Sequence, residues 1–187
     1  DKAARMLGLP YPGGPEISRL AEYARTENIP HKAKFTRPML HSNTLDFSFS
    51  GLKTAVLYYI RDNFNDTSPL LENDKADIAR EFEDAVVEVL LTKTKNALDQ
   101  IEAKTLIIAG GVIASKKIRE VFMNLEKEYK GLIVKTPNKS LSTDNSVMIA
   151  SAAYINLLLY PQLLRQKQTI IANGNLKLGI SQELRLN

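Results

Sequence analysis

Two short, continuous apolar runs with a helical pattern between them constrain this fold more than any other feature of the sequence. The runs are Thr-Leu-Ile-Ile-Ala at residues 105–109 and Leu-Ile-Val at residues 132–134. Runs of this length are typical of strands that are buried on both faces. The segment between them repeats apolar residues at helical spacing: Ile118, Val121, Phe122 and Leu125. Strand, helix and strand in this order predict an α/β fold with a mainly parallel sheet flanked by helices.

Helical periodicity extends to both sides of this unit. Residues 1–7 are expected to form a short helix that stops at Gly8, a residue type that often ends helices. Residues 9–15 contain prolines and glycines that do not allow regular structure. The apolar faces of four further predicted helices are Ile17, Leu20, Ala21 and Ala24; Leu52, Val56, Tyr59 and Ile60; Ile78, Phe82, Ala85, Val86, Val89 and Leu90; and Met148, Ile149, Ala152 and Ile155.

The segment between residues 28 and 51 has a different character. Residues 28–43 contain both histidines, His31 and His41, and are predicted to form a surface loop. Their separation does not match the one-turn spacing of helical metal pairs, so both are interpreted as solvated loop residues. Residues 45–50 alternate apolar and polar side chains, which predicts a half-buried strand that ends at Gly51.

Composition excludes several classes of chemistry. The chain has 187 residues, enough for one compact core, and no cysteine, so disulfides, thiolate metal sites and cysteine nucleophiles are excluded. No apolar run is long enough to span a bilayer and no signal peptide is found, so a cytoplasmic protein without a membrane partner is expected. The net charge of +4 permits an RNA or nucleotide partner without requiring one.

Two loops that follow the predicted strands carry the candidate chemistry. Gly110-Gly111 comes directly after the first strand, where open α/β sheets bind ligands, although a tight turn explains the pair equally well. Asp144 follows the second strand, where a helix cap is favoured over a metal ligand by roughly three to one. The two loops are expected to lie near each other because they follow successive strands. Three basic residues after the glycines are interpreted as solvated charges or as contacts for an anion: Lys116, Lys117 and Arg119.

Several motifs together resemble one known family. They are Pro-Tyr-Pro-Gly-Gly-Pro at residues 10–15, Asp-Phe-Ser-Phe-Ser-Gly-Leu-Lys-Thr at residues 46–54, Ala-Gly-Gly-Val at residues 109–112 and Thr-Asp-Asn-Ser at residues 143–146. In this order and spacing they resemble the tRNA N6-adenosine threonylcarbamoyltransferase family, known as TsaD in bacteria. The resemblance covers nearly everything up to about Leu159.

This resemblance implies a fold, a reaction and partners. The fold would be an actin-like, Hsp70-like ATPase of the ribonuclease H-like type, with residues 1–164 as an incomplete C-terminal lobe and residues 165–187 as a divergent tail. The reaction would transfer threonylcarbamoyl from threonylcarbamoyl-AMP to N6 of adenosine 37 in tRNAs that read codons beginning with A. The implied cofactor is one divalent metal ion, iron or zinc. The implied partners are tRNA, a paralogous heterodimer partner and an ATPase.

The resemblance also assigns roles to individual residues. Asp1 matches the family's acidic group that binds the nucleotide ribose, and Gly14 matches another nucleotide contact. Gly110 and Gly111 match the glycine pair near the phosphates and base. Asp144 matches the carboxylate metal ligand, which reverses the cap interpretation.

The sequence departs from the family in two ways. Ser115 stands where the family usually has a ligand-contacting Asn, so its contact with the nucleotide is expected to be weaker or less direct. The remaining metal ligands are a His-x-x-x-His pair of the N-terminal lobe, and the sequence contains no such pair. The chain is therefore expected to be part of a larger enzyme and inactive alone. The alternative is a non-catalytic relative that acts as a scaffold or dimerisation module; the family motifs disfavour an actin-like sugar kinase lobe.

Overall fold

The computed structural model describes residues 1–64, 69–142 and 145–162. The chain divides into two compact units, Asp1–Asp144 and Asn145–Asn187, each of which is described by itself. The elements of the first unit are α1 (Lys2–Met6), α2 (Gly13–Thr26), α3 (Phe49–Asn63), α4 (Glu72–Gln100), β1 (Thr105–Ile107), η1 (Gly111–Ala114), α5 (Lys116–Met123), α6 (Leu125–Glu128), β2 (Ile133–Lys135) and η2 (Lys139–Leu141). The second unit contributes α7 (Ser146–Leu159).

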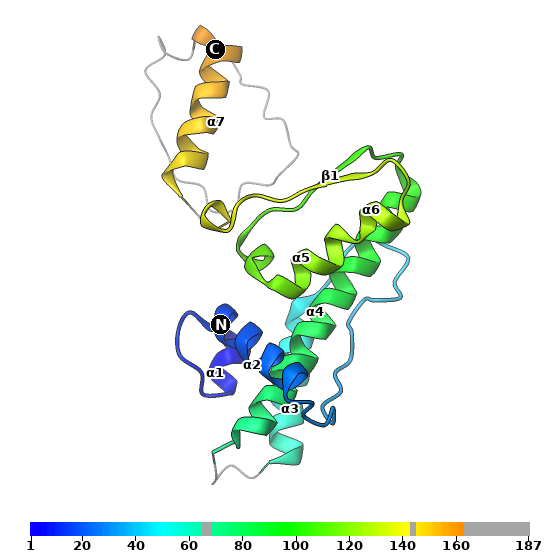
Figure 1. Ribbon diagram of the computed structural model, residues 1–187, viewed down its shortest axis with the longest axis vertical. Helices are drawn as coiled ribbons and strands as arrows, with labels where there is room; N and C mark the ends of the chain where they lie inside the picture. Colours follow the sequence, from blue (N-terminus) through cyan, green and yellow to red (C-terminus); the bar gives the residue numbers. More distant parts are fainter. Residues whose placement is uncertain (65–68, 143–144, 163–187) are drawn as a thin grey trace. The chain divides into compact units, whose positions relative to one another are not determined.

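Helix α4 is the axis of the first unit (Figure 1). It is 29 residues long, and α2, α3 and α5 all pack against it. Its N-terminal half forms one apolar core with α1, α2 and α3, in which Leu20, Leu52 and Ile78 are almost fully buried. The predicted apolar faces of these helices are therefore confirmed. Residues of α4, α5 and the two strands form a second core, which includes Val87, Ile118, Phe122, Leu125 and Val134.

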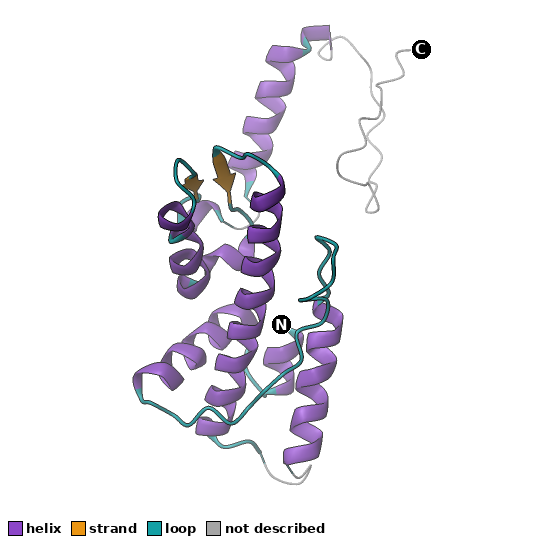
Figure 2. Ribbon diagram, turned by 90° about the vertical axis from the view of Figure 1, so that its right-hand side faces the viewer, coloured by secondary structure: helices purple, strands orange, loops and turns teal. Residues whose placement is uncertain are grey.

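The predicted strand–helix–strand unit is confirmed. β1 pairs with β2 in parallel, with Leu106 opposite Val134, and Figure 2 shows the strand pair beside α4. α5 follows β1 through η1, as the apolar spacing after the glycine pair predicts. The prediction that both faces of the strands are buried is wrong within the described part of this unit. Ile107 is 71% exposed and Ile133 is 50% exposed, because the helices of this unit cover only the face that carries Leu106 and Val134.

The strand predicted at residues 45–50 does not form. Residues 43–45 are bends, Ser48 is the N-cap of α3, and the helix begins at Phe49. Alternating polarity predicts a strand only where a partner strand is available, and in the described structure the sheet consists of β1 and β2. Gly51 therefore lies inside α3 instead of ending a strand. A side chain at this position would come within 2.7 Å of Pro38 Cγ, so glycine permits the close approach of the loop.

The second unit is described up to residue 162, and the predicted helix is present as α7. Asn145 caps α7, because its side chain accepts a hydrogen bond from the amide of Met148 at 3.0 Å. None of the side chains of α7 is buried, including the predicted apolar face with Met148 and Ile149. In the described residues, no helix combines the length and the apolar character needed to cross a membrane. The domain boundary predicted at residue 164 lies outside the described residues.

The first prediction concerns the core between α3 and α4. Replacing Leu52, which is 1% exposed, by alanine should lower the free energy of unfolding by about 2–5 kcal/mol, because it leaves a cavity in the apolar core. Leu57 lies on the same helix but is 47% exposed, so Leu57→Ala should cost about 0.5 kcal/mol or less. Urea denaturation of the two variants measures both effects. Equal losses in the two variants would contradict the placement of α3.

Candidate functional site

Asp1 and the Pro-Gly-Gly-Pro loop lie together at the start of α2. The carboxylate of Asp1 accepts a hydrogen bond from the amide of Gly13 at 2.8 Å. A side chain at Gly13 would collide with Ala4 Cβ, so this position requires glycine. By contrast, apart from its chain neighbours and the backbone of its own helix, no protein atom lies within 4 Å of the position that a Cβ would take at Gly14. The structure thus brings together two residues predicted to contact a nucleotide, and it leaves open space beside Gly14.

The second glycine pair lies at the end of β1. Gly110 has φ +101°, a conformation that side-chain-bearing residues rarely adopt, and Gly111 begins η1. Ile113 anchors the loop because its side chain is buried in the second core. Both glycines have free space within 4 Å of an added Cβ. The loop therefore presents its backbone at the carboxyl end of a parallel strand, the edge at which α/β sheets bind ligands.

Glu83 on α4 connects α2 and α5, the helices that carry or follow the two glycine motifs. Its Oε1 accepts a hydrogen bond from the hydroxyl of Ser18 on α2 at 2.8 Å and another from Ser115, the N-cap of α5, at 3.1 Å. In the described residues no hydrogen bond or ion pair joins Asp1 or Gly14 directly to the glycine pair after β1. Helices α2 and α5 are linked through this buried carboxylate, and at the surface Glu22 of α2 also pairs with Lys116 of α5 at 3.2 Å.

The charge of Glu83 is compensated by Arg25 of α2. Arg25 Nη1 lies 2.7 Å from Glu83 Oε2, and its Nη2 lies 2.6 Å from Asp84 Oδ1. Burial opposes the charge of the guanidinium, but the hydrogen bond to Glu83 and the nearby carboxylate of Asp84 outweigh it and raise the pKa of Arg25 above its usual value. Glu83 is 6% exposed, so this pairing is what allows a carboxylate in the interior.

Ser115, which the resemblance places opposite a ligand-contacting Asn, has a structural role. Its hydroxyl donates to Glu83 and accepts from the amide of Ile118 at 3.3 Å, which caps α5. A serine hydroxyl has one proton to donate, and in the structure that proton faces Glu83. The role of Ser115 as a nucleotide contact stays a prediction, and a ligand would meet this hydroxyl as an acceptor.

Arg119 of α5 ties the loop after β1 to the segment after β2. Its Nε donates to the carbonyl of Ile113 at 2.7 Å, and its Nη2 donates to the carbonyl of Pro137 at 2.9 Å and to Ser142 Oγ at 3.0 Å. Nη1 donates to Thr136 Oγ1 at 3.1 Å. All three nitrogens of the Arg119 guanidinium thus donate hydrogen bonds within the protein. The interpretation of Arg119 as a solvated charge or as a contact for an anion is therefore wrong. Within the described residues Arg119 thus joins η1 to residues 136–142, and the expected proximity of Gly110-Gly111 to Asp144 stays a prediction.

The predicted metal ligand, Asp144, lies outside the described residues. Ser142, two positions earlier, is buried and bonded to Arg119. The cap role considered for Thr143-Asp144 is taken by Asn145. Among residues 1–64, 69–142 and 145–162, no three His, Cys, Asp or Glu side chains form a group that could hold a metal ion. The described residues therefore do not fit a complete metal site, and the role of Asp144 stays a prediction.

Other charged residues of α4 have partners that sequence patterns do not reveal. His31 Nε2 lies 3.0 Å from Glu81 Oε2, so this histidine is not simply solvated. Glu81 also accepts a hydrogen bond from the amide of Phe35 at 2.8 Å, and Asp77 accepts one from the amide of Ala33 at 2.8 Å. The detectable signal is that Asp77 and Glu81 are one helical turn apart and adjoin the apolar face of α4.

The geometry defines the class of domain. Two loops that follow neighbouring parallel strands, joined by one arginine, form an α/β domain of the kind that binds ligands at the carboxyl edge of its sheet. The sequence model of the tRNA N6-adenosine threonylcarbamoyltransferase family, TsaD, matches residues 1–151. The chain belongs to this family, and the resemblance found in the sequence is confirmed.

Similar proteins that bear this name come from several bacteria. The protein of Herminiimonas arsenicoxydans is 49% identical over 161 residues, which cover 86% of this chain and 45% of that protein. The protein of Paraburkholderia xenovorans is 46% identical over 161 residues, with the same coverage of 86% and 45%. The protein of Burkholderia mallei is 45% identical over 163 residues, or 86% of this chain and 46% of that protein. The chain thus spans less than half the length of these relatives.

The second prediction tests the link through Glu83. Glu83→Gln should lower the free energy of unfolding by about 1–3 kcal/mol, because the amide cannot replace a buried carboxylate paired with Arg25. The control is Glu22→Gln, since Glu22 pairs with Lys116 at the surface and its loss should leave the denaturation midpoint unchanged within error. If the two variants unfold at the same denaturant concentration, Glu83 does not hold α2 and α5 together.

The third prediction concerns Arg119. Arg119→Lys keeps the charge, but one ammonium group cannot reach Ile113, Pro137 and Ser142 at once. Amide hydrogen exchange at residues 111–115 and 138–142 should become faster by about tenfold, the effect of losing roughly one hydrogen bond. Arg61→Lys, the same replacement on the surface of α3, is the control. Acceleration in only one of the two segments would show that Arg119 does not couple them.

Proposed function

We propose that this chain supplies the nucleotide-contacting, C-terminal part of an enzyme that transfers threonylcarbamoyl from threonylcarbamoyl-AMP to N6 of adenosine 37 of tRNA. The tRNAs would be those that read codons beginning with A. Family membership supports this proposal, and the observation that carries it is that Ser18, Glu83 and Ser115 join the helices next to the two glycine motifs. Family membership also implies the actin-like fold, with which a helix-rich domain containing a parallel strand pair is compatible.

In this proposal the chain binds and orients the adenylate. Asp1 would contact the ribose and Gly14 another part of the nucleotide, while Gly110 and Gly111 would lie against the phosphate and base. Free space beside three of these residues, the glycines, supports such contacts because a ligand can approach the backbone closely. An exocyclic adenine amine is a poor nucleophile, so holding it in line with the carbonyl carbon would supply much of the rate enhancement.

The metal and the partners belong to the same proposal. Asp144 would bind one divalent ion, iron or zinc, together with ligands outside this chain, since the described residues do not form such a site themselves. The partners would be tRNA, a paralogous heterodimer partner and an ATPase, in the cytoplasm.

One observation favours a second function. The hydroxyl of Ser115 is engaged by Glu83 and by the cap of α5, at a position where the family usually contacts its ligand. A relative that has lost this contact would serve as a non-catalytic scaffold or dimerisation module. Nucleotide binding separates the two functions, since a scaffold has no need to bind AMP.

The fourth prediction tests the proposed function. Isothermal titration should show weak binding of AMP to the 187-residue chain, and a tRNA assay should show no threonylcarbamoyl transfer by the chain alone. Gly14→Ala should weaken AMP binding by about tenfold, because the methyl group takes up the space beside the loop. It should not reduce stability, since the methyl group meets no protein atom within 4 Å.

Gly13→Ala is the matched control. Its methyl group collides with Ala4, so this variant should lose stability, which separates damage to the fold from loss of a ligand contact. Undiminished AMP binding by the Gly14→Ala variant removes Gly14 from the site. Absence of AMP binding by the unaltered chain favours the scaffold, and robust transfer by the chain alone contradicts the proposal that further parts are needed.

A further inference from the structure

A polar pocket of about 440 Å³ lies between the irregular segment of residues 40–45 and the C-terminal part of α4. Its volume is within the range of ligand-binding pockets, and neither glycine motif contributes to its lining. Among the described residues that line it there is no aspartate, glutamate, lysine or arginine. The pocket is therefore distinct from the candidate nucleotide site, and its lining suits an uncharged group with hydrogen-bond donors and acceptors.

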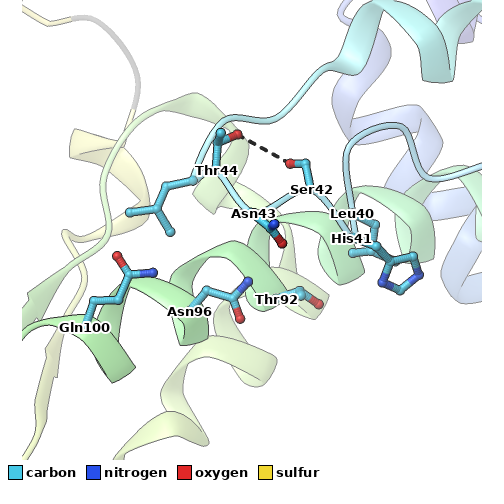
Figure 3. A pocket seen from close by; sticks show the side chains of 9 residues that line it. Leu40, His41, Ser42, Asn43, Thr44, Thr92, Asn96 and Gln100 are labelled. Atoms are coloured by element: carbon cyan, nitrogen blue, oxygen red, sulfur yellow. Dashed lines mark hydrogen bonds between the residues drawn. The ribbon is translucent and has the colours of Figure 1, made fainter.

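One side of the pocket is a row of polar side chains along α4. Thr92, Asn96 and Gln100 follow one another at four-residue intervals, so neighbouring members are about 6 Å apart along the helix axis. In Figure 3 the amides of Asn96 and Gln100 rise from the helix toward the segment opposite. Neither side-chain amide forms a hydrogen bond with another described residue. The row thus presents unused donors and acceptors at regular spacing.

This spacing is close to the repeat of an extended polypeptide. Along one edge of a β-strand, every second residue presents its N–H and C=O groups, and the repeat is about 6.6 Å. A side-chain amide has an acceptor oxygen and a donor NH₂ group, so it can pair with both backbone groups of one residue. Asn96 and Gln100 therefore match two successive positions on one edge of an extended segment, and the hydroxyl of Thr92 matches the next.

The opposite side of the pocket has backbone groups that are not used within the described structure. Lys93 is 4% exposed and donates to the carbonyls of Ser42 at 3.0 Å and Thr44 at 2.7 Å, which fixes the segment on α4. The backbone amides of Asn43 and Leu45 make no hydrogen bond to any other described residue. The segment is thus held in place before a ligand arrives, while donors that a strand normally uses stay available.

The residues that continue this segment have the sequence pattern of a strand. Leu45, Asp46 and Phe47 alternate apolar and polar side chains, and in the described structure no strand pairs with them. Leu45 is 39% exposed and Phe47 is 51% exposed. Asp46 is also exposed and forms no ion pair with a described residue. Side chains in this pattern are stabilised by those of a partner strand, and the described part of the chain does not supply one.

We propose that this pocket binds an extended segment of another protein by β-strand addition. The segment lies between residues 43–47 and the row of polar side chains on α4, and its backbone pairs with both. In this mode of recognition main-chain hydrogen bonds supply affinity and alternate side chains supply specificity. Side chains on the same face of a strand pair meet, so Asp46 favours a lysine or arginine in the partner, flanked by apolar residues that meet Leu45 and Phe47.

A second copy of this chain is a poorer occupant than a segment of another protein. Symmetric antiparallel pairing of residues 45–47 with the same residues of a copy places Asp46 opposite Asp46. Like charges directly opposite each other are destabilising. The charge of Asp46 therefore selects a partner with a basic centre over self-association.

The test is an NMR titration of the ¹⁵N-labelled 187-residue chain with short blocked peptides. Acetyl-Thr-Val-Lys-Val-Thr-amide should shift the side-chain amide signals of Asn96 and Gln100 and the backbone signals of residues 43–47. The same peptide with Glu in place of Lys should bind about two- to fivefold more weakly, the effect of one cross-strand charge pair. N-methylation of both valines should weaken binding by about tenfold or more, because it removes main-chain donors.

The matched variants are Asp46→Lys and Asp62→Lys, which reverse exposed charges in the segment and on α3. Asp46→Lys should make the Glu peptide bind more tightly than the Lys peptide, whereas Asp62→Lys should keep the order of the unaltered chain. Asn96→Ala should weaken the binding of both peptides by about two- to tenfold, the effect of losing one hydrogen bond. Amide signal dispersion confirms that the variants are folded.

Three results of the titrations would overturn the proposal. They are unmoved signals of residues 43–47, Asn96 and Gln100 at saturating Lys peptide, equal binding of the N-methylated peptide, and an unchanged order of the two peptides with Asp46→Lys. Dimerisation of the peptide-free chain that Asp46→Asn strengthens, measured by sedimentation, would also overturn it, because a second copy then occupies the segment. None of these results bears on AMP binding at the glycine loops.

Discussion

The first unit depends on how α4 satisfies the polar backbone of an irregular segment packed against it. Residues 27–48 contain no helix or strand, so their buried amides and carbonyls cannot bond to one another as regular structure does. Asp77 and Glu81 accept hydrogen bonds from these amides, and Lys93 donates to the carbonyls. Three charged side chains of one helix thus replace the missing secondary structure and fix the segment on its surface.

The same helix determines the geometry of the candidate nucleotide site. Glu83 accepts hydrogen bonds from the hydroxyls of Ser18 and Ser115, and these bonds hold α2 and α5 against α4. Arg119 joins the loop after β1 to the segment after β2, because it donates hydrogen bonds to the carbonyls of Ile113 and Pro137. Gly14, Gly110 and Gly111 have open space beside them, while the helices next to them are held by these contacts. A rigid support with an accessible backbone is what a binding site for a small anionic ligand requires.

The sequence predicted the elements whose pattern depends on local or apolar forces. The faces of α2, α3 and α4 and the parallel strand pair are visible because Leu20, Leu52, Ile78 and their neighbours recur at regular spacing. Glycine motifs and their order also located the two loops. The strand predicted at residues 45–50 fails because alternation shows nothing about the availability of a partner strand.

Buried charged residues were the other part that sequence patterns could not predict. Glu83 and Lys93 occupy interior positions that the apolar pattern treats as surface. Arg119 looks like a solvated charge until the carbonyls around it are placed in space. Their partners are far away in the chain, from 17 to 65 residues for the side-chain contacts with Thr136 and Ser18. Only the folded chain brings such pairs together.

The strand pair has a consequence for assembly. In the described sheet each strand has one neighbour, so each retains an edge whose backbone amides and carbonyls point outward. Both strands are only three residues long, which limits the number of backbone hydrogen bonds that a strand of another molecule could form with them. The open edges could pair only with a further strand, whereas the exposed Ile107 and Ile133 would need a separate layer packed on the face of the sheet to bury them.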